Sequence, residues 1–380
     1  MRKRKNAAVQ AAVYLTLVLT LPFIGSALVK SAPFSVGILE AAAENSVSNV
    51  LGTPIVTTVS PIRETFAEAS TQIVTERTFK IITDDSVIHQ DFYAAVPRSY
   101  DEEAEIDEAP PLQAGNGTVE IIQYGFMTGD EYVSLPEGQF GQIRNLYGLD
   151  EEILLEAAKN TAPKLKGDGS PEVLIYHTHA TESYLIEASD TYDTAFLFRS
   201  TDECINMVSI GNAIKDELEK SGIGVIHDKT LYDEESYNGS YELSRKGVTA
   251  ILEENPTIKI VIDVHRDAIV RSETEIVAPT CLIDGKEAAQ IMIVSNCNSN
   301  KLKYPIPDFL ENLTLACDIQ NAAEGMFPGL MRPILFDDRQ YNQDLSTGCL
   351  LIEIGGHGNS LAQAEYSGQL LGKAIAALQE

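Results

Sequence analysis

The chain has little positive charge and no internal repetition, and each shortage excludes a class of protein. It carries 28 Lys and Arg residues against 56 Asp and Glu residues, which gives a formal net charge of -28. Such a chain repels a phosphate backbone, so general DNA or RNA binding is excluded. Neither an internal repeat nor a coiled-coil heptad is present, which excludes a repeat array and a long coiled coil.

Cysteine is also too scarce and too scattered to organise the fold. The five cysteines contain no C-x-x-C pair and lie at Cys204, Cys281, Cys297, Cys317 and Cys349. This spacing fits neither a zinc ribbon nor a small disulfide framework, and the odd number leaves at least one thiol free. We interpret these residues as ordinary half-buried thiols.

The first 30 residues predict a cytoplasmic tip and a membrane anchor. Four basic residues, 2–5, precede an uncharged run over 7–29 that is about long enough to cross a bilayer as a helix. The basic cluster predicts a single-pass protein of the cell membrane, with its N-terminus inside and the rest of the chain extracytoplasmic. A cleaved signal peptide is the alternative, because residues 27–29 offer a weak cleavage site.

The remainder divides into a spacer and one folded domain. Residues 31–117 mix short β-branched stretches with polar runs, and the acidic run 101–108 is followed by two prolines. Such a segment repels itself and buries little, so we expect a partly ordered spacer. Turn-forming residues begin to recur at regular intervals near Thr118. Because 44% of the chain is hydrophobic, residues 118–380 can bury a sizeable core.

Alternating apolar runs and amphipathic segments after Pro171 predict an α/β fold, with a mostly parallel sheet flanked by helices. The predicted strands are short and apolar without strict alternation, as in strands covered on both faces; they span 173–176, 223–226, 258–264, 289–294 and 350–354. One helix is expected to follow an N-cap region at 200–202 and to end at Gly222. A final helix is expected over 361–378.

Three of only six histidines lie at the ends of predicted strands, namely His177, His179 and His265. Ligands bind at the carboxyl ends of strands in open α/β sheets. His177 and His179 point to the same side if the chain stays extended, and Glu182 follows three residues later. Two imidazoles, one carboxylate and an open position form a known catalytic zinc set.

Charged residues surround this set. Asp263 or Asp267 could accept the spare N–H of His265 and fix its tautomer. Arg266 is placed to stabilise a developing oxyanion. Glu353 lies in an apolar strand, where a buried acid is costly unless it has a chemical task or a cation nearby.

Each feature alone has a structural explanation. A histidine at a strand end is usually a hydrogen-bonded structural residue, Glu182 also fits a helix-capping pattern, and Glu353 could pair with an arginine. Their occurrence together at three strand ends predicts a catalytic metal site. Of the other histidines, His89 and His227 are interpreted as solvated surface residues, and His357 could line the cleft.

The chain resembles the stage II sporulation protein P family of cell-wall hydrolases. The resemblance rests on four motifs in order, at residues 174–184, 262–268, 341–346 and 351–356, within a match over about 118–380. That family is similar to zinc N-acetylmuramoyl-L-alanine amidases, so the resemblance implies a zinc hydrolase domain over 118–380.

The resemblance also implies roles for single residues. It places the first zinc ligand at His179, with His177 as the alternative, and the second histidine ligand at His265. The middle ligand is Glu182 by the sporulation-protein motif or Glu203 by the position in the wider amidase group. The catalytic carboxylate is Glu353, with Arg266 and Asp267 as supporting groups.

The implied activity is hydrolysis of the amide between the muramic acid lactyl group and L-alanine of peptidoglycan, with endopeptidase action as a second activity. The implied setting is septal wall removal during engulfment, alongside a lytic transglycosylase and a membrane scaffold protein. Two alternatives stand: a non-catalytic wall-binding scaffold in the same complex, and a zinc carboxypeptidase that cleaves a different bond.

Overall fold

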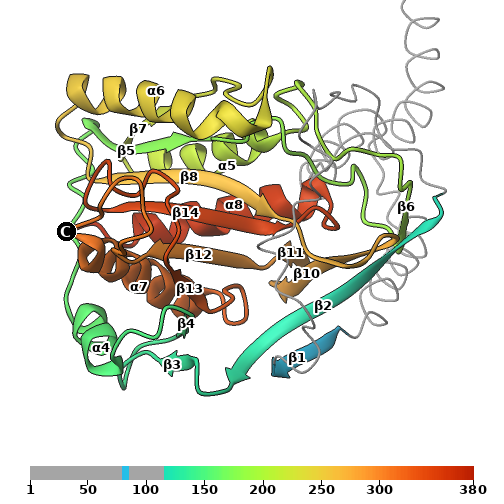
Figure 1. The fold of residues 1–380 in the computed structure, drawn as a ribbon, viewed down its shortest axis with the longest axis horizontal. Helices are drawn as coiled ribbons and strands as arrows, with labels where there is room; N and C mark the ends of the chain where they lie inside the picture. Colours follow the sequence, from blue (N-terminus) through green and yellow to red (C-terminus); the bar gives the residue numbers. More distant parts are fainter. Residues whose placement is uncertain (1–78, 85–114) are drawn as a thin grey trace, which may run out of the picture. The chain divides into compact units, whose positions relative to one another are not determined.

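A mixed eight-stranded sheet forms the centre of the computed structural model, which describes residues 79–84 and 115–380 (Figure 1). In sheet order its strands are β3 (Tyr132–Ser134), β4 (Gln142–Asn145), β13 (Ile334–Asp337), β12 (Ile291–Asn296), β14 (Cys349–Gly356), β8 (Ile260–Asp267), β5 (Pro171–Tyr176) and β7 (Gly224–His227). Strands β14, β8, β5 and β7 run parallel to one another. Because β12 is antiparallel to β14, and β3 to β4, the sheet is mostly but not wholly parallel.

All five predicted strands lie in this sheet. Their uninterrupted apolar runs are explained by helices on both faces. The helices are α4 (Glu151–Lys159), α5 (Met207–Lys220), α6 (Ser240–Glu254), α7 (Phe309–Met326) and α8 (Leu361–Ala376), and the short 3-10 helix η4 (Tyr237–Gly239) precedes α6.

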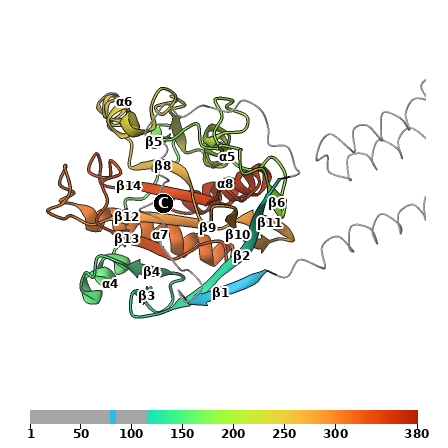
Figure 2. The same ribbon diagram turned by 45° about the vertical axis from the view of Figure 1, so that its right-hand side comes forward.

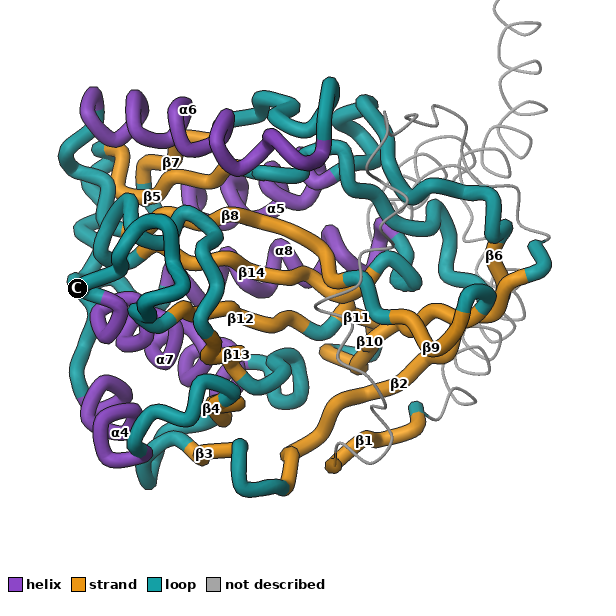
Figure 3. The backbone as a smooth tube through the Cα atoms, in the orientation of Figure 1, coloured by secondary structure: helices purple, strands orange, loops and turns teal. Residues whose placement is uncertain are grey.

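The faces of the sheet are covered unequally (Figure 3). On one face, Ile175 and Ile262 belong to a large core that includes residues of α5, α7 and α8. On the other face, Leu174 and Val261 pack with Val248 of α6. The alternation of side chains along each strand therefore decides which helix layer a residue meets.

The two predicted helices exist, but one begins later than expected. The final helix, α8, starts with a capping box in which Ser360 and Gln363 bond reciprocally. The cap of α5 is Asn206, whose side chain accepts from the backbone N–H of Val208 at 2.9 Å. The predicted N-cap at 200–202 is wrong, because these side chains close a turn of their own before the helix.

A second sheet, absent from the sequence-based expectation, lies beside the first. It contains β1 (Lys80–Asp84), β2 (Gly117–Thr128), β10 (Glu275–Ile283) and β11 (Lys286–Ala289), with β6 (Thr191–Tyr192) on β2 and β9 (Val270–Ser272) on β10. Figure 2 shows β1 running alongside β2. The stretch assigned to the spacer thus contributes strand β1.

The predicted membrane anchor and cytoplasmic tip, as well as His89, lie outside the described residues. Within 79–84 and 115–380, no helix combines the length and hydrophobicity needed to cross a bilayer. All five cysteines are free thiols; Cys204 is exposed and the other four are buried.

Close packing between α5 and α8 depends on glycine. A Cβ on Gly372 of α8 would lie 2.8 Å from the backbone oxygen of Ile214 in α5. Since such a contact cannot form without movement, the two helices can approach this closely only because Gly372 has no side chain.

We therefore expect Gly372→Ala to lower the free energy of unfolding by about 1–3 kcal/mol, because overpacking outweighs the better helix propensity of alanine. Urea unfolding measures the change. The matched control is Gly325→Ala in α7, where the new Cβ would meet only the Phe140 ring at 3.4 Å. Equal stabilities of the two variants would contradict the packing argument.

Candidate active site

The candidate site lies at the carboxyl ends of three neighbouring parallel strands, β5, β8 and β14. His265 of β8 and Glu353 of β14 are direct partners in the ladder, so their side chains share one face of the sheet. Asp263 lies two residues before His265 and therefore shares this face too. The strand register thus places the carboxyl groups of Glu353 and Asp263 on the same face as the imidazole of His265.

The loop after β5 adds His179 and Glu182 to this group. The chain turns at residues 178–180 instead of staying extended. As a result the ring of His179 lies 5.3 Å from that of His265, nearly perpendicular to it. Glu182 Oε2 lies 3.7 Å from Nδ1 of His265. All three residues are buried.

His177 does not join them, because alternation along β5 places it with Ile175 on the opposite face of the sheet. Its ring lies on the α5 face, with Nδ1 2.9 Å from the carbonyl oxygen of Val264 and Nε2 2.8 Å from Nε2 of His227. Burial lowers the pKa of His177 to about 4, so the ring is neutral. The interpretation of His227 as a solvated surface residue is wrong, because it is half-buried against His177 and Asn212.

A buried carboxylate supports His265. Asp263 Oδ1 lies 2.8 Å from Nε2 of His265, which is an ion pair without the geometry of a hydrogen bond, so Asp263 and not Asp267 is the carboxylate beside this ring nitrogen. Burial opposes the charge on this imidazole, but Asp263, Glu182 and Glu353 outweigh burial and raise the pKa of His265 to about 10. Without a metal ion, His265 is therefore a protonated partner of Asp263.

His179 also faces a buried carboxylate, one that sequence reasoning missed. Asp233 Oδ2 lies 3.7 Å from Nδ1 of His179 and forms an ion pair with Arg199 at 2.7 Å. The ring of Tyr237 stacks on His179 at 3.9 Å between centroids. Asp233 lies among several acids in the loop between β7 and α6, where no strand end marked it as a candidate.

Among the carboxylates of the site, Glu353 has the negative charge that its neighbours stabilise least. Its Oε2 is buried and has no hydrogen-bond partner. Burial, and then the negative charge of Asp267, raise the pKa of Glu353 above its usual range. Arg332 does not pair with Glu353; it forms an ion pair with Asp267 at 2.7 Å. A buried acid left in this state is suited to carrying a proton.

Two predicted residues have other contacts. The guanidinium of Arg266 donates to the backbone oxygens of Ser183 and Phe198, at 3.0 and 3.2 Å. It therefore braces the loop that carries Glu182, and these contacts do not support the expected oxyanion role. Glu203, the alternative middle ligand, forms an exposed ion pair with Lys229.

His357 lies behind the site. Its ring packs edge-on against Phe198 at 5.0 Å between centroids, and its backbone N–H donates to the carbonyl oxygen of Asp267. Burial, and then the charge of Arg266, lower the pKa of His357 to about 3. A neutral ring packed in this way is a structural residue of the strand end.

The donor chemistry of His179, Glu182 and His265 fits zinc. Each imidazole has one nitrogen facing a buried carboxylate, as is usual for metal-bound histidines. The 3.7 Å between Glu182 Oε2 and His265 Nδ1 is near the separation of about 3.4 Å expected for two atoms bound to one tetrahedral ion. No three His, Cys, Asp or Glu side chains in the described part of the chain are already grouped to hold an ion.

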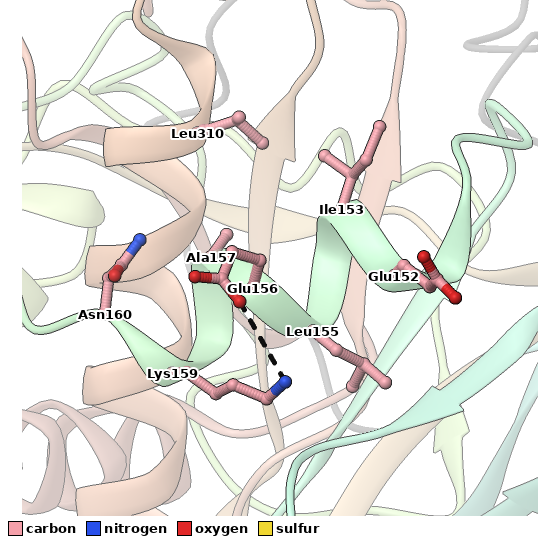
Figure 4. A pocket seen from close by; sticks show the side chains of 8 residues that line it. All are labelled: Glu152, Ile153, Leu155, Glu156, Ala157, Lys159, Asn160 and Leu310. Atoms are coloured by element: carbon pink, nitrogen blue, oxygen red, sulfur yellow. Dashed lines mark ion pairs between the residues drawn. The ribbon is translucent and has the colours of Figure 1, made fainter.

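A cavity along α4 lies away from the candidate site. It has a volume of about 560 Å³ and runs along α4 (Figure 4). Its lining consists of Glu152, Ile153, Leu155, Glu156, Ala157, Lys159, Asn160 and Leu310. None of these residues belongs to the three strand ends, so this cavity has no part in the candidate chemistry.

We expect the ring of His265 to stay protonated at pH 8 in the metal-free protein, because its pKa is raised to about 10. Ring 15N NMR, with the signal assigned by its loss in His265→Gln, measures this state. Asp263→Asn should make the ring neutral at pH 8. The His177 ring serves as the control and should be neutral at pH 6. A neutral His265 at pH 8 in the unchanged protein would contradict the ion pair.

The same shift predicts how stability depends on pH. The folded pKa of His265 lies above the ordinary value of 6.5, so its contribution is fully present below about pH 6.5. That contribution should be lost as the pH rises toward about 10, and urea unfolding of the metal-free protein across this range would reveal the loss.

Comparison with known proteins identifies the family. The sequence pattern of stage II sporulation protein P (SpoIIP) matches residues 137–376. Stage II sporulation protein P of Bacillus subtilis (strain 168) is 31% identical over 219 residues, which cover 55% of this chain and 51% of that protein. The chain thus spans about half the length of this relative.

Solved structures of amidases are also similar to this chain, although distantly. The CwlD amidase from Clostridioides difficile, in complex with the GerS lipoprotein, has a TM-score of 0.34 and 16% identity over 54% of this chain and 94% of that chain. The N-acetylmuramoyl-L-alanine amidase AmiC2 of Nostoc punctiforme has a TM-score of 0.31 and 11% identity over 56% of this chain and 96% of that chain. Likenesses at these scores carry no argument about activity.

The family match covers more than half of the chain and contains all four sequence motifs, including both strand-end motifs of the candidate site. This protein therefore belongs to the stage II sporulation protein P family.

Proposed function

We propose that this protein is a zinc-dependent peptidoglycan hydrolase, which cleaves the amide between the muramic acid lactyl group and L-alanine. The observation that carries the proposal is the gathering of His179, Glu182, His265 and Glu353 at neighbouring strand ends. Two imidazoles and one carboxylate, with a second carboxylate nearby to handle protons, match the requirements of metal-assisted amide hydrolysis.

In this proposal His179, Glu182 and His265 hold the ion. Zinc, when bound, lowers the pKa of a coordinated water to near neutrality and polarises the scissile carbonyl. The buried carboxylates Asp233 and Asp263 orient the two imidazoles from behind. Binding requires neutral imidazoles, so His265 must release the proton that its ion pair with Asp263 stabilises.

Glu353 is the proposed proton carrier. Its carboxylate takes a proton from the attacking water, whose oxygen forms the new bond to the carbonyl carbon. As the C–N bond breaks, the same proton passes to the leaving amine, so that the products are a carboxylic acid and an amine. A raised pKa suits both halves of this task, because the group accepts and releases a proton near neutral pH.

The proposed cellular location and process follow from membership of the family and from the basic residues near the N-terminus. The hydrolase domain would act outside the cytoplasm, held to the cell membrane by residues 7–29, on septal wall during engulfment. A lytic transglycosylase and a membrane scaffold protein are the proposed partners, and cleavage within stem peptides is a proposed second activity.

Glu353→Gln should lower the turnover of purified peptidoglycan at least about 100-fold, because it removes the proton carrier. The measurement is the release of stem peptides, with and without a chelator, followed by mass analysis of the fragments. The control is Glu311→Gln, at an exposed position of α7. Release that persists in the chelator would count against zinc, and no release by any form of the protein would favour the scaffold alternative.

Metal content distinguishes the candidate ligands. We expect His179→Ala and His265→Ala to weaken zinc binding at least about 100-fold, since each removes one donor. His177→Ala should keep the metal, because its ring bonds to Val264 and His227. Zinc content after dialysis, with a melting curve for each variant, is the readout. Loss of zinc in a folded His177→Ala variant, with retention in His179→Ala, would reverse the assignment.

A further inference from the structure

The loop between β13 and β14 contains two neighbouring non-glycine residues with left-handed backbones. Tyr341 has φ 38° and Asn342 has φ 53°. Asparagine tolerates this region, but a bulky tyrosine rarely adopts it. Such strain persists only where surrounding contacts hold it, and it gathers at functional sites. This loop is also the one family motif, residues 341–346, that the proposed chemistry does not yet use.

Side chains of the motif hold the strained backbone in place. Asn342 donates to the carbonyl oxygen of Tyr241 at 3.0 Å and to Ser244 Oγ at 3.1 Å. Gln343 accepts from the backbone N–H of Asn296 and donates to the carbonyl oxygen of Val294. Asp344 forms an ion pair with Arg245. The motif is thus fastened to α6 on one side and to β12 on the other.

The strained backbone places the Tyr341 ring on the same face of the sheet as Glu353. The ring packs against the apolar cluster of Met292, Val294, Leu335 and Leu351. Met292 of β12 is paired with Glu353 of β14 in the ladder, and Leu351 lies two residues before Glu353 on the same strand. This cluster therefore shares a face of the sheet with the proposed base, and Tyr341 covers that face.

Tyr241 separates Tyr341 from the proposed ligand His179. Its ring lies 5.6 Å from that of Tyr241, and the Tyr241 ring lies 5.5 Å from that of His179. Tyr341 thus lies between the proposed base and the aromatic residues around His179. It is only partly buried, so a substrate can reach it.

The hydroxyl of Tyr341 is prepared to donate a hydrogen bond. Arg339 Nη1 donates to it at 3.2 Å, so the phenol oxygen accepts from a cation and keeps its own proton for another acceptor. Burial raises the pKa of Tyr341, so the proton stays on at neutral pH. Arg266, the donor expected from the sequence, is already bonded to two backbone carbonyls.

We propose that Tyr341 is a catalytic residue whose hydroxyl donates a hydrogen bond to the carbonyl oxygen of the scissile amide. The inference rests on the proposed hydrolase function. As water adds to the carbonyl carbon, negative charge develops on that oxygen, and the hydrogen bond from Tyr341 strengthens. Tyr341 transfers no proton and forms no covalent bond.

Tyr341→Phe removes the hydroxyl and keeps the ring. We expect its turnover number to fall about 100- to 1,000-fold, with little change in KM or melting temperature. The matched control is Tyr366→Phe on α8, whose hydroxyl donates to the backbone oxygen of Ile283 and should be dispensable for turnover. A Tyr341→Phe enzyme within threefold of the unchanged protein would overturn the proposal, whereas failure of the unchanged protein itself would count against the hydrolase function.

A second measurement does not depend on turnover. In Glu353→Gln protein labelled with 13Cζ-tyrosine, the Tyr341 signal is assigned by its loss in a variant that also carries Tyr341→Phe. Addition of a muramoyl peptide that contains the intact lactyl–L-alanine amide should shift this signal and leave that of Tyr366 unchanged. A Tyr341 signal that stays in place at saturating peptide would contradict the contact.

Discussion

The buried carboxylate of Asp263 connects the two strand ends that carry the site. It accepts from the backbone N–H of Thr178 at 2.8 Å, from the Thr178 hydroxyl at 2.6 Å, and it pairs with His265. A buried charge without such partners would cost several kcal/mol. Because Thr178 belongs to the turn after β5, the bonds that satisfy Asp263 also fix the turn. The position of His179 therefore depends on Asp263 as much as that of His265 does.

Carboxylates outnumber arginines at the site. Arg199 is bound by Asp233 and Arg332 by Asp267, whereas Arg266 donates to two backbone carbonyls. Glu182 lies beside the His265 ring, and one oxygen of Glu353 is buried without a hydrogen-bond donor. A divalent cation would relieve this imbalance and would replace the proton on His265. The same electrostatics that strain the metal-free site thus favour metal binding.

The sequence predicted those parts of the fold that local patterns determine. Strands β5, β8 and β14 were found because their apolar runs are uninterrupted, and Glu353 was found because it interrupts one. The second sheet was missed, since β2 alternates irregularly and β1 lies in a segment that also contains long polar runs. Strand β10 of the second sheet contacts β14 of the first, but no local sequence pattern predicts this contact.

The site itself could be predicted only in part, for the same reason. The direction of His179 is decided by a turn at 178–180, which depends on the distant Asp263. Asp233 contacts His179 from a loop more than fifty residues away, so spacing along the chain gave no sign of it. Arg266 stands in the expected place, yet its direction follows the carbonyls of the loop across from it.

The central claim is that His179, Glu182 and His265 share one metal ion, in reach of Glu353. The most direct test is a crystal structure of the zinc-loaded protein with anomalous diffraction recorded on both sides of the zinc absorption edge. The account predicts a single strong anomalous peak bounded by these three side chains, with His177 still bonded to His227. A peak between His177 and His227, or no peak at the three strand ends, would contradict it.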